Sequence, residues 1–402
     1  MIHILESNKK YDVVVCGCGS AGFCAAVAAA RNGARTAVIE KYSTPGGILT
    51  VLGNNSIDQF NNPFRKTNKM VIGGIGWEFV LKLYRDGFAR IPDMNADYVE
   101  HSQYGVKVNP VAAAKVMDDM LIDAGVDLYY GQPIVDVETE DRMIKSVLIS
   151  TKDGVKRIEA ALFIDCTGDA DIAHFAKAST FDGDGDGNFQ PGTIRYYPAV
   201  SPDASDKVLN YGDNRNHVSM NSTNSDMVTL SEIESRRLLY NDMLGGKLIM
   251  GSAPAVAPRE GRRIKGISTM KVEDYFLGKQ YDDSVCYTFW FVDIHRKGMA
   301  SEIYYIKHEN TPSVRLSSMI SSEFDNLAMA GRCISTDRQT NSAIRVKASC
   351  MAMGQAIGTA SAVAVQNKIK IKDISVNDLK AKLSLQGAIV PGISDGEEFG
   401  PN

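Results

Sequence analysis

Residues Tyr11–Glu40 read YDVVVCGCGSAGFCAAVAAARNGARTAVIE, and this stretch decides the fold of the 402-residue chain. It has a short β-branched strand, a glycine-rich turn, a helix of small residues, a second strand and a closing acid. Gly17, Gly19 and Gly22 fit the pattern G-x-G-x-x-G. The first glycine permits the tight turn, the second lets the backbone approach a pyrophosphate, and the third lets the helix pack close to the strand. The stretch therefore predicts a βαβ dinucleotide-binding unit.

The polar groups of this unit match the parts of a dinucleotide. Ser20 and Ala21 open the helix, whose free N–H groups and positive dipole end suit a phosphate. Glu40 closes the second strand at the spacing expected for an acceptor from a ribose hydroxyl, and it disfavours NADP because the extra phosphate would be repelled. The alternative is a glycine turn without a ligand, but the complete βαβ context favours the nucleotide site.

The next segment, Lys41–Thr50, contains the doublet Gly46-Gly47. Here the chain resembles the FAD-dependent oxidoreductases of the glutathione-reductase-like superfamily, the flavoproteins with two dinucleotide-binding domains. The resemblance implies FAD rather than NAD, with Lys41 beside the cofactor, the doublet as a second backbone surface and Thr50 facing the flavin. Taken alone, the doublet indicates only an ordinary Pro-Gly turn.

Later stretches extend the resemblance. The apolar strand 161–165 leads into Thr167-Gly168-Asp169, which resembles the Ala-Thr-Gly element of the superfamily, and a predicted meander (146–151 and 155–159) precedes it. In related folds the strand starting at Ile134 contacts the adenine end through its backbone. The superfamily usually has Gly-Asp at the ribityl chain, whereas this chain has Gly331-Arg332.

That departure is typical of one group of bacterial FAD-dependent oxidoreductases. The segments that resemble this group are 259–264, 292–295, 331–335, 343–346 and 350–360. The resemblance implies that a helix begins at Ser342–Arg345 and directs its N-terminus to the pyrimidine edge of the flavin, with Ala343 and Ile344 at the cofactor. A positive dipole end there would stabilise the anion formed on reduction. The alternative is a plain core helix that contains glycine.

The expected fold is α/β: a Rossmann-like FAD-binding domain, with a parallel sheet and a β-meander, that carries an inserted α+β substrate domain. The FAD-binding domain is predicted to be discontinuous, formed by residues 1–60, 106–175 and 325–402. Residues 61–105 and 176–324 are predicted to form the substrate or cap domain. The second segment is richer in Asn, Ser, Asp, Tyr and Arg, and the first is expected to extend the same side.

Composition narrows the classes of function. The net charge of −4 gives no electrostatic case for nucleic acid or an anionic membrane. The first residues lack the basic start and apolar core of a signal sequence, and no apolar run approaches the roughly 20 residues of a membrane span, so a cytoplasmic location is expected.

The 7 cysteines include no C-x-x-C pair, and the histidines form no H-x-x-x-H pair, so no metal is predicted. Residues 182–193 begin like a calcium loop but end in Thr193 instead of the required glutamate, which favours a polar turn.

Three residues are candidates for catalysis: His295, Arg259 and Arg263. His295 follows Asp293 at the spacing that puts both side chains on one face of a strand, which suits an acid/base group near the flavin. A structural or substrate-binding histidine is the alternative. The arginines suit a substrate carboxylate or a brace between domains, and the alternative is a surface cluster of salt bridges.

The expected reaction is hydride transfer between a small polar metabolite, at a C–H next to O or N, and N5 of non-covalently bound FAD. Reduction of a C=C bond or similar acceptor with electrons from a separate donor is the first alternative. A non-redox flavoprotein such as an isomerase is the second. The expected partners are a small-molecule substrate and an external electron acceptor or donor, and a homo-oligomer is left open.

Overall fold

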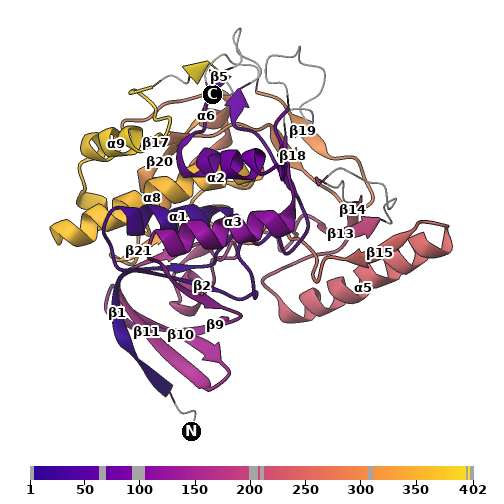
Figure 1. Cartoon of the computed structure of the whole chain (residues 1–402), viewed down its shortest axis with the longest axis horizontal. Helices are drawn as coiled ribbons and strands as arrows, with labels where there is room; N and C mark the ends of the chain where they lie inside the picture. The colour runs from indigo at the N-terminus through magenta and orange to yellow at the C-terminus, as the bar shows by residue number, and fades with distance from the viewer. Residues whose placement is uncertain are drawn as a thin grey trace.

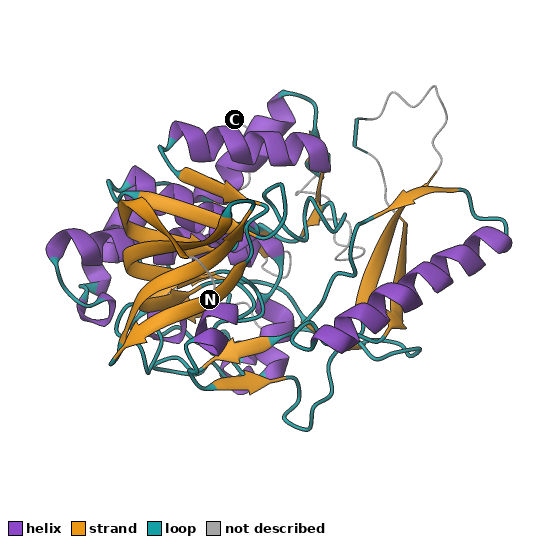
Figure 2. Cartoon of the chain, turned by 90° about the horizontal axis from the view of Figure 1, so that it is seen from below, coloured by secondary structure: helices purple, strands orange, loops and turns teal. Residues whose placement is uncertain are grey.

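The computed structural model describes residues 4–62, 69–92, 105–198, 207–208, 212–306, 311–394 and 397–398. A large body surrounds a central sheet, and an arm projects from this body (Figure 1, Figure 2). The arm consists of the three-stranded sheet β13 (Gly192–Pro198), β14 (Gly212–Val218) and β15 (Ile249–Ser252) with the long helix α5 (Ser225–Leu244).

The central sheet confirms the predicted α/β class. Its strands follow the order β8-β2-β1-β11-β10-β9, and β21 pairs with β11. The pairs among β8, β2, β1, β11 and β21 are parallel, whereas β9 and β10 continue from β11 as an antiparallel meander. The bounds are β1 (Ile4–Cys16), β2 (Thr36–Glu40), β8 (Asp127–Tyr130), β9 (Ile134–Glu140), β10 (Met143–Thr151), β11 (Gly154–Asp165) and β21 (Leu327–Met329).

Strand β11 is longer than the sequence pattern indicates. The segments 155–159 and 161–165, predicted as separate strands, form one strand of 12 residues. Its first half pairs with β10, and its last three residues pair with β21. One strand therefore joins the meander to the carboxyl edge of the parallel sheet, where Thr167 follows.

Helices α1 (Ser20–Arg31) and α8 (Lys347–Asn367) pack against each other beside the sheet (Figure 1). Glycines make the close approach feasible: a Cβ atom on Gly354 would lie 2.1 Å from the carbonyl oxygen of Ala21, and one on Gly358 would lie 2.2 Å from that of Ala25. Among the described helices α8 is long and apolar enough to cross a membrane, but 83% of that apolar window is buried inside the protein. Core packing therefore accounts for its apolar composition.

The sequence Asn109-Pro110 is typical of a helix start, and helix α3 (Pro110–Asp123) begins there. The side chain of Asn109 accepts hydrogen bonds from the backbone N–H groups of Val111 and Ala112, and Pro110 occupies the first turn. The helix ends before Gly125, whose φ of +81° suits a residue without a side chain.

The other elements surround the sheet and the base of the arm. The helices are α2 (Gly74–Arg85), α4 (Asp171–Phe175), α6 (Val272–Phe276), α7 (Arg338–Ile344), α9 (Val376–Leu385) and the short 3₁₀ turns η2 (Leu316–Met319) and η3 (Ile371–Asp373). The strands are β3 (Ser56–Ile57), β4 (Asn61–Asn62), β5 (Lys69–Met70), β6 (Ala89–Arg90), β7 (Val106–Val108), β12 (Thr180–Asp182), β16 (Arg262–Ile264), β17 (Ser284–Tyr287), β18 (Val292–Ile294), β19 (Glu302–Tyr304), β20 (Ser313–Arg315) and β22 (Glu397–Glu398).

The arm has its own small hydrophobic cluster, separate from the main core. It contains Ile194, Val218, Met220, Leu239, Ala253 and Val256. The arm lies within the predicted substrate domain 176–324. The predicted boundaries themselves remain a prediction, and parts of both inserted segments lie outside the described residues.

Candidate functional site

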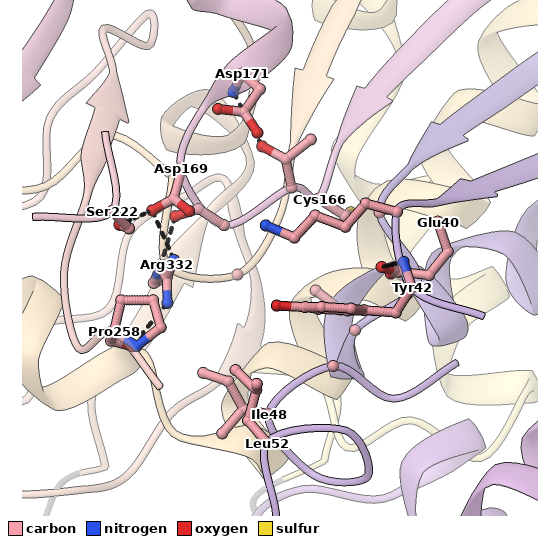
Figure 3. A pocket seen from close by; sticks show the side chains of 18 of the residues that line it. Glu40, Tyr42, Ile48, Leu52, Cys166, Asp169, Asp171, Ser222, Pro258 and Arg332 are labelled. Atoms are coloured by element: carbon pink, nitrogen blue, oxygen red, sulfur yellow. Dashed lines mark hydrogen bonds and ion pairs between the residues drawn. The ribbon is translucent and has the colours of Figure 1, made fainter. Parts of the chain in front are cut away.

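An extended cavity opens at the carboxyl ends of the parallel strands, where α/β proteins bind their ligands. We call it the nucleotide cavity. Arg332 and Tyr42 reach into it from facing walls, with Ile48 and Leu52 beside Tyr42 (Figure 3). Most of the predicted cofactor residues line it: Gly17, Gly19, Ser20, Ala21, Glu40, Lys41, Gly47, Ile134, Thr167, Gly168, Asp169, Gly331 and Arg332.

The glycine turn has the geometry that a phosphate group needs. Gly17 has a φ of +96°, and a Cβ atom on Gly22 would lie 1.8 Å from the carbonyl oxygen of Gly17. A Cβ atom on Gly19 would meet no described atom within 4 Å, so this glycine keeps the surface of the turn clear. Helix α1 has no side-chain cap at Gly19 and no acid in its first turn, as far as the described residues show. Its first N–H groups therefore suit a bound pyrophosphate.

Glu40 is buried at the end of β2. Its carboxylate accepts hydrogen bonds from the backbone N–H groups of Cys18 at 2.7 Å and Tyr42 at 3.0 Å. Burial raises the pKa of this carboxyl group above its ordinary value, and the two N–H donors only partly offset that effect. A hydroxyl donor from a ribose would add to these hydrogen bonds, so the residue fits its predicted role.

The doublet Gly46-Gly47 lies against the glycine turn. Gly46 forms a parallel bridge with Gly19, and its N–H donates to the carbonyl of Cys18 at 2.7 Å. Gly47 lines the cavity, and its φ is +51°. Thr50 is placed differently from the prediction, because its hydroxyl donates to the carbonyl of Pro45 and its side chain is buried. Among the residues that the structure describes, Gly22, Gly46 and Thr50 support the cavity wall without lining it.

Arg332 forms an ion pair with Asp169, although the superfamily usually has an acid at position 332. Its Nη2 donates to Oδ1 of Asp169 at 2.6 Å, and its Nε donates to the carbonyl of Gly168 at 2.6 Å (Figure 3). Ser222 of the arm also donates to Oδ1 of Asp169, at 2.6 Å. Burial raises the pKa of Asp169, but the charges of Arg332 and Lys41 outweigh it and hold that pKa below its ordinary value. The arginine therefore adds no net charge to the cavity.

The long helix beside the nucleotide cavity starts later than the sequence predicts. Ser342–Ile344 form the end of the short helix α7, and α8 begins only at Lys347. The side chain of Asp337 caps the start of α7 by accepting from the N–H of Thr340 at 2.8 Å, and the extended backbone of Val346, with a ψ of 149°, separates α7 from α8. Ala343 and Ile344 are fully buried; of this region the described lining contains instead Arg345, Lys347 and Cys350.

His295 lines a neighbouring polar cavity, which we call the His295 pocket. Its other lining residues include Asp184, Ser219, Met220 and Arg338. Met220 also lines the nucleotide cavity, so its side chain belongs to a wall that the two cavities share. His295 therefore does not line the nucleotide cavity itself; it lines a second cavity that adjoins it.

The imidazole of His295 has a partner on each nitrogen. Nε2 lies 2.9 Å from Oδ2 of Asp293, and Nδ1 lies 2.8 Å from the hydroxyl oxygen of Ser301. The pKa of Asp293 is below its ordinary value, because the hydrogen bond from His295 and the charge of Arg345 outweigh the effect of burial. A carboxylate only accepts, so Nε2 carries the hydrogen and Nδ1 has the lone pair. Burial lowers the pKa of His295, and Asp293 only partly offsets that effect.

Asp293 connects the two cavities. Nη2 of Arg345, which lines the nucleotide cavity, donates to the backbone carbonyl of Asp293 at 3.2 Å and lies 3.9 Å from its Oδ2. The same carboxylate oxygen contacts His295, which lines the other cavity. One carboxylate oxygen therefore lies beside a lining residue of each cavity.

The cluster of Arg259, Arg262 and Arg263 is not the surface group that the alternative interpretation expected, because Arg262 and Arg263 are buried. Arg263 donates to the carbonyls of Thr336 and Gly183. The guanidinium of Arg259 donates to the carbonyl of Pro191. Neither Arg259 nor Arg263 is among the described lining residues of the nucleotide cavity or the His295 pocket, but the charge of Arg259 lowers the pKa values of both His295 and Asp293.

Three residues that were not predicted as site residues, Arg338, Glu260 and Gln190, hold the His295 pocket in shape. Arg338 donates from Nη2 and Nε to Glu260 at 2.7 and 2.9 Å. Glu260 also accepts from the backbone N–H of Gln190, whose side-chain oxygen accepts from the N–H of His295 at 3.0 Å. These partners are far apart in the chain, so no local sequence pattern marks them.

The segment 182–193, which begins like a calcium loop in the sequence, forms a turn beside the His295 pocket. Asp184 accepts from the backbone N–H groups of Asp186 and Asn188, both at 3.0 Å. The described residues contain no cluster of three or more His, Cys, Asp or Glu side chains that could hold a metal ion.

Comparison with known proteins supplies the family. The family model for FAD-dependent oxidoreductases matches residues 12–240 and 244–383. The chain belongs to this family. It is therefore an FAD-dependent enzyme. No protein with a curated description matches the chain at a significant level.

Solved structures are similar over most of the chain. A geranylgeranyl bacteriochlorophyll reductase-like protein from Thermoplasma acidophilum is 12% identical, with a TM-score of 0.44, over 94% of this chain and 91% of the other. The anhydrotetracycline hydroxylase OxyS from Streptomyces rimosus is 12% identical, with a TM-score of 0.45, over 93% and 65%. The flavin-dependent brominase Bmp2 is 11% identical, with a TM-score of 0.47, over 94% and 84%.

Proposed function

We propose that this FAD-dependent oxidoreductase transfers a hydride between N5 of FAD and a small polar metabolite, at a C–H bond next to oxygen or nitrogen. The observation that carries the proposal is the position of His295, which is hydrogen-bonded to Asp293 and lines a polar cavity that shares Met220 with the nucleotide cavity. FAD supplies the hydride chemistry, and the chain supplies orientation and proton transfer.

The nucleotide cavity suits the extended shape of FAD. We assign the adenosine ribose to Glu40, the pyrophosphate to the N-terminus of α1, and the isoalloxazine end to the region of Arg345 and Lys347. The clear surface at Gly19 and the uncapped helix support the middle assignment. We propose non-covalent binding, since the sequence has no covalent-attachment signal. The glycine turn and meander also support membership of the glutathione-reductase-like superfamily.

His295 is proposed as the base. A substrate hydroxyl or amine in the pocket would lose its proton to Nδ1, directly or through the hydroxyl of Ser301, which already contacts that atom. Asp293 holds the ring in the required tautomer and faces the charge that forms on protonation. The lowered pKa of His295 keeps the imidazole neutral at physiological pH, as a base requires.

We further propose a cytoplasmic location and an external electron acceptor. The sequence contains one glycine-rich nucleotide motif, so a second nucleotide site for NAD(P)H is not indicated. A separate molecule would therefore remove the electrons from reduced FAD after each turnover.

The experiment is anaerobic mixing of the yellow protein with a panel of small polar alcohols, amines and hydroxy acids. Loss of the visible flavin absorbance with one class of compound supports the proposal. Re-oxidation of dithionite-reduced enzyme by an unsaturated acceptor would favour the reductase alternative. A compound that is converted while the flavin spectrum never changes would favour a non-redox role.

A further inference from the structure

The charged side chains of the His295 pocket are already paired with opposite charges. The charged members of its described lining are Asp184, Arg296, Lys297, Glu302 and Arg338. Arg296 pairs with Glu302 at 2.5 Å, and Lys297 pairs with Glu234 at 2.6 Å. Arg338 pairs with Glu260 at 2.7 Å, and its Nη1 lies 3.6 Å from Oδ2 of Asp184. The lining that the structure describes therefore offers a ligand no uncompensated charge.

Arg338 is the cation that is held most firmly. Its guanidinium makes two hydrogen bonds to Glu260, whose side chain is 1% exposed. Turning Arg338 toward a ligand would leave that buried carboxylate unpaired, which is costly. The side chains of Arg296 and Lys297 are 57% and 50% exposed, and an ion pair formed that far into solvent adds little affinity. A substrate carboxylate therefore has no strong partner in the described lining.

A substrate ammonium group meets the same obstacle. Asp184 accepts from the backbone N–H groups of Asp186 and Asn188 and from Nδ2 of Asn188, besides facing Arg338. The other acid of the described lining, Glu302, faces Arg296. Burial lowers the pKa of His295, so its imidazole is neutral at physiological pH and adds no charge.

The uncharged polar groups of the lining both donate and accept hydrogen bonds. Oγ of Ser219 accepts from Lys297 at 2.8 Å, so the hydroxyl hydrogen can be donated elsewhere. Oδ1 of Asn221 accepts from the N–H and the hydroxyl of Thr223 at 3.0 and 2.7 Å, which makes the amide NH₂ group the donor. Asn188 donates through Nδ2 to Asp184, so its side-chain oxygen is an acceptor. A hydroxyl both donates and accepts, so a ligand with several hydroxyls can match all of these groups.

The pocket also has apolar lining residues, namely Phe189, Pro191, Met220, Met227 and Ile294. Such side chains suit the C–H groups of a carbon skeleton. The volume of the pocket, about 720 Å³, lies within the roughly 300–1,000 Å³ of small-molecule sites. C–H surface and many hydroxyls in one uncharged molecule are the chemistry of sugars and sugar alcohols.

We propose that the His295 pocket binds an uncharged polyhydroxylated substrate, a sugar or sugar alcohol, and selects against acids and amines of the same size. The inference rests on the proposed function for its reaction. One substrate hydroxyl loses its proton to His295, the carbon that carries this hydroxyl loses a hydride to FAD, and a carbonyl group forms as FAD is reduced. The paired charges supply the selectivity, because a charged ligand must either displace one member of an ion pair or stay unpaired.

The test compares matched compounds on one carbon skeleton: hexoses and pentoses as the aldose, the sugar alcohol, the aldonate and the 2-amino sugar. Binding is measured by isothermal titration calorimetry on the dithionite-reduced holoenzyme, which cannot accept a hydride. Reaction is measured separately, by anaerobic flavin reduction in the oxidised holoenzyme. We expect the neutral members to bind about tenfold or more tightly than the acids and amines. Tighter binding of the acids or amines, or no binding of any neutral member, would overturn the inference.

Two variants test whether the ion pairs set this selectivity. Asp184→Asn removes the exposed acid beside Arg338, and Glu260→Gln removes its buried partner. Each leaves Arg338 with unmatched positive charge, so each should strengthen aldonate binding, Glu260→Gln by about tenfold. Asp186→Asn is the matched control, because it removes the same charge from the same turn at a residue outside the described lining, and its aldonate affinity should stay within about twofold of the wild type.

Unchanged aldonate affinity in both Asp184→Asn and Glu260→Gln would overturn the inference. If Glu260→Gln does not fold, Asp184→Asn alone decides, since Asp184 is an exposed residue of a turn. Neutral sugars that bind but never reduce the flavin would instead contradict the proposed hydride transfer, while the class of ligand would stand.

Discussion

Oδ2 of Asp293 lies 2.9 Å from Nε2 of His295, which lines the His295 pocket, and 3.9 Å from Nη2 of Arg345, which lines the nucleotide cavity. The contact fixes the imidazole with its lone pair on Nδ1, and burial keeps the ring uncharged. Together these features make His295 a suitable base for a substrate in the pocket, and they lead to the first prediction.

The pH dependence of flavin reduction should report on His295. Its pKa lies below the ordinary value, so kcat/KM should be constant near neutral pH and should fall only as the pH drops through a value below about 6.5. Asp293→Asn removes the partner that raises this pKa, so the acid limb should move to lower pH while the plateau falls. Stopped-flow rates across the pH range measure both effects. An acid limb above the ordinary histidine pKa would contradict this assignment.

Glu40 should contribute directly to FAD affinity. Glu40→Ala removes the proposed acceptor from the ribose hydroxyls and should weaken FAD binding by about 1–3 kcal/mol, the scale of a charged hydrogen bond. Glu40→Gln is the matched control, since it keeps one acceptor oxygen, and its loss should be smaller. Fluorescence titration of the apoprotein with FAD measures both. Unchanged affinity in Glu40→Ala would show that another group holds the ribose.

The flavin itself should be released by acid or heat, because the proposed binding is non-covalent. The supernatant of the precipitated protein should contain the full complement of FAD by absorbance and chromatography. Flavin that stays in the pellet would demonstrate a covalent link to the chain.

The buried pair of Arg332 and Asp169 should be strongly coupled. Removing one partner leaves the other charge buried, so Arg332→Met should lower the free energy of unfolding by about 3–5 kcal/mol. The double variant Arg332→Met with Asp169→Asn should lose less than the sum of the single variants. Urea denaturation of the wild type, the two single variants and the double variant, all without FAD, measures the four free energies of unfolding. Strictly additive losses would mean that the two side chains act independently.

The close crossing of α1 and α8 should not tolerate a methyl group. A Cβ atom on Gly354 would lie 2.1 Å from the carbonyl oxygen of Ala21, so Gly354→Ala should cost about 1–3 kcal/mol of stability by forcing the helices apart. Gly245→Ala is the control, because Gly245 has a φ of −77° at the end of α5, and its effect should stay within about 0.5 kcal/mol. Thermal unfolding measures both variants. A wild-type melting temperature in Gly354→Ala would show that the crossing adapts.

Local patterns in the sequence were sufficient for the parts of the site that the backbone builds. The glycine turn, the closing Glu40 and the cap at Asn109 each depend on residues within one βαβ or helix-start motif, and the structure places them as those motifs require. The meander is likewise visible from alternation and turn residues. Short-range geometry determines all of these features.

The rest of the site depends on contacts between distant segments. Arg332 and Asp169 are 163 positions apart, and the sequence alone indicates only that an unusual residue follows Gly331. The start of α8 was misplaced because the extended backbone of Val346 interrupts the helical segment, a feature that apolar periodicity does not reveal. The shared wall at Met220 forms only because the base of the arm lies beside the nucleotide cavity in the folded chain.

The central claim is that a substrate in the His295 pocket loses its proton to His295 while FAD accepts the hydride. The most direct measurement is anaerobic stopped-flow reduction of the flavin in His295→Gln at saturating substrate, once the metabolite panel has identified one. The account predicts normal FAD content and a reduction rate about 10²–10⁴-fold below the wild type, the usual contribution of a general base. A rate within a few-fold of the wild type would contradict the account and assign His295 to structure.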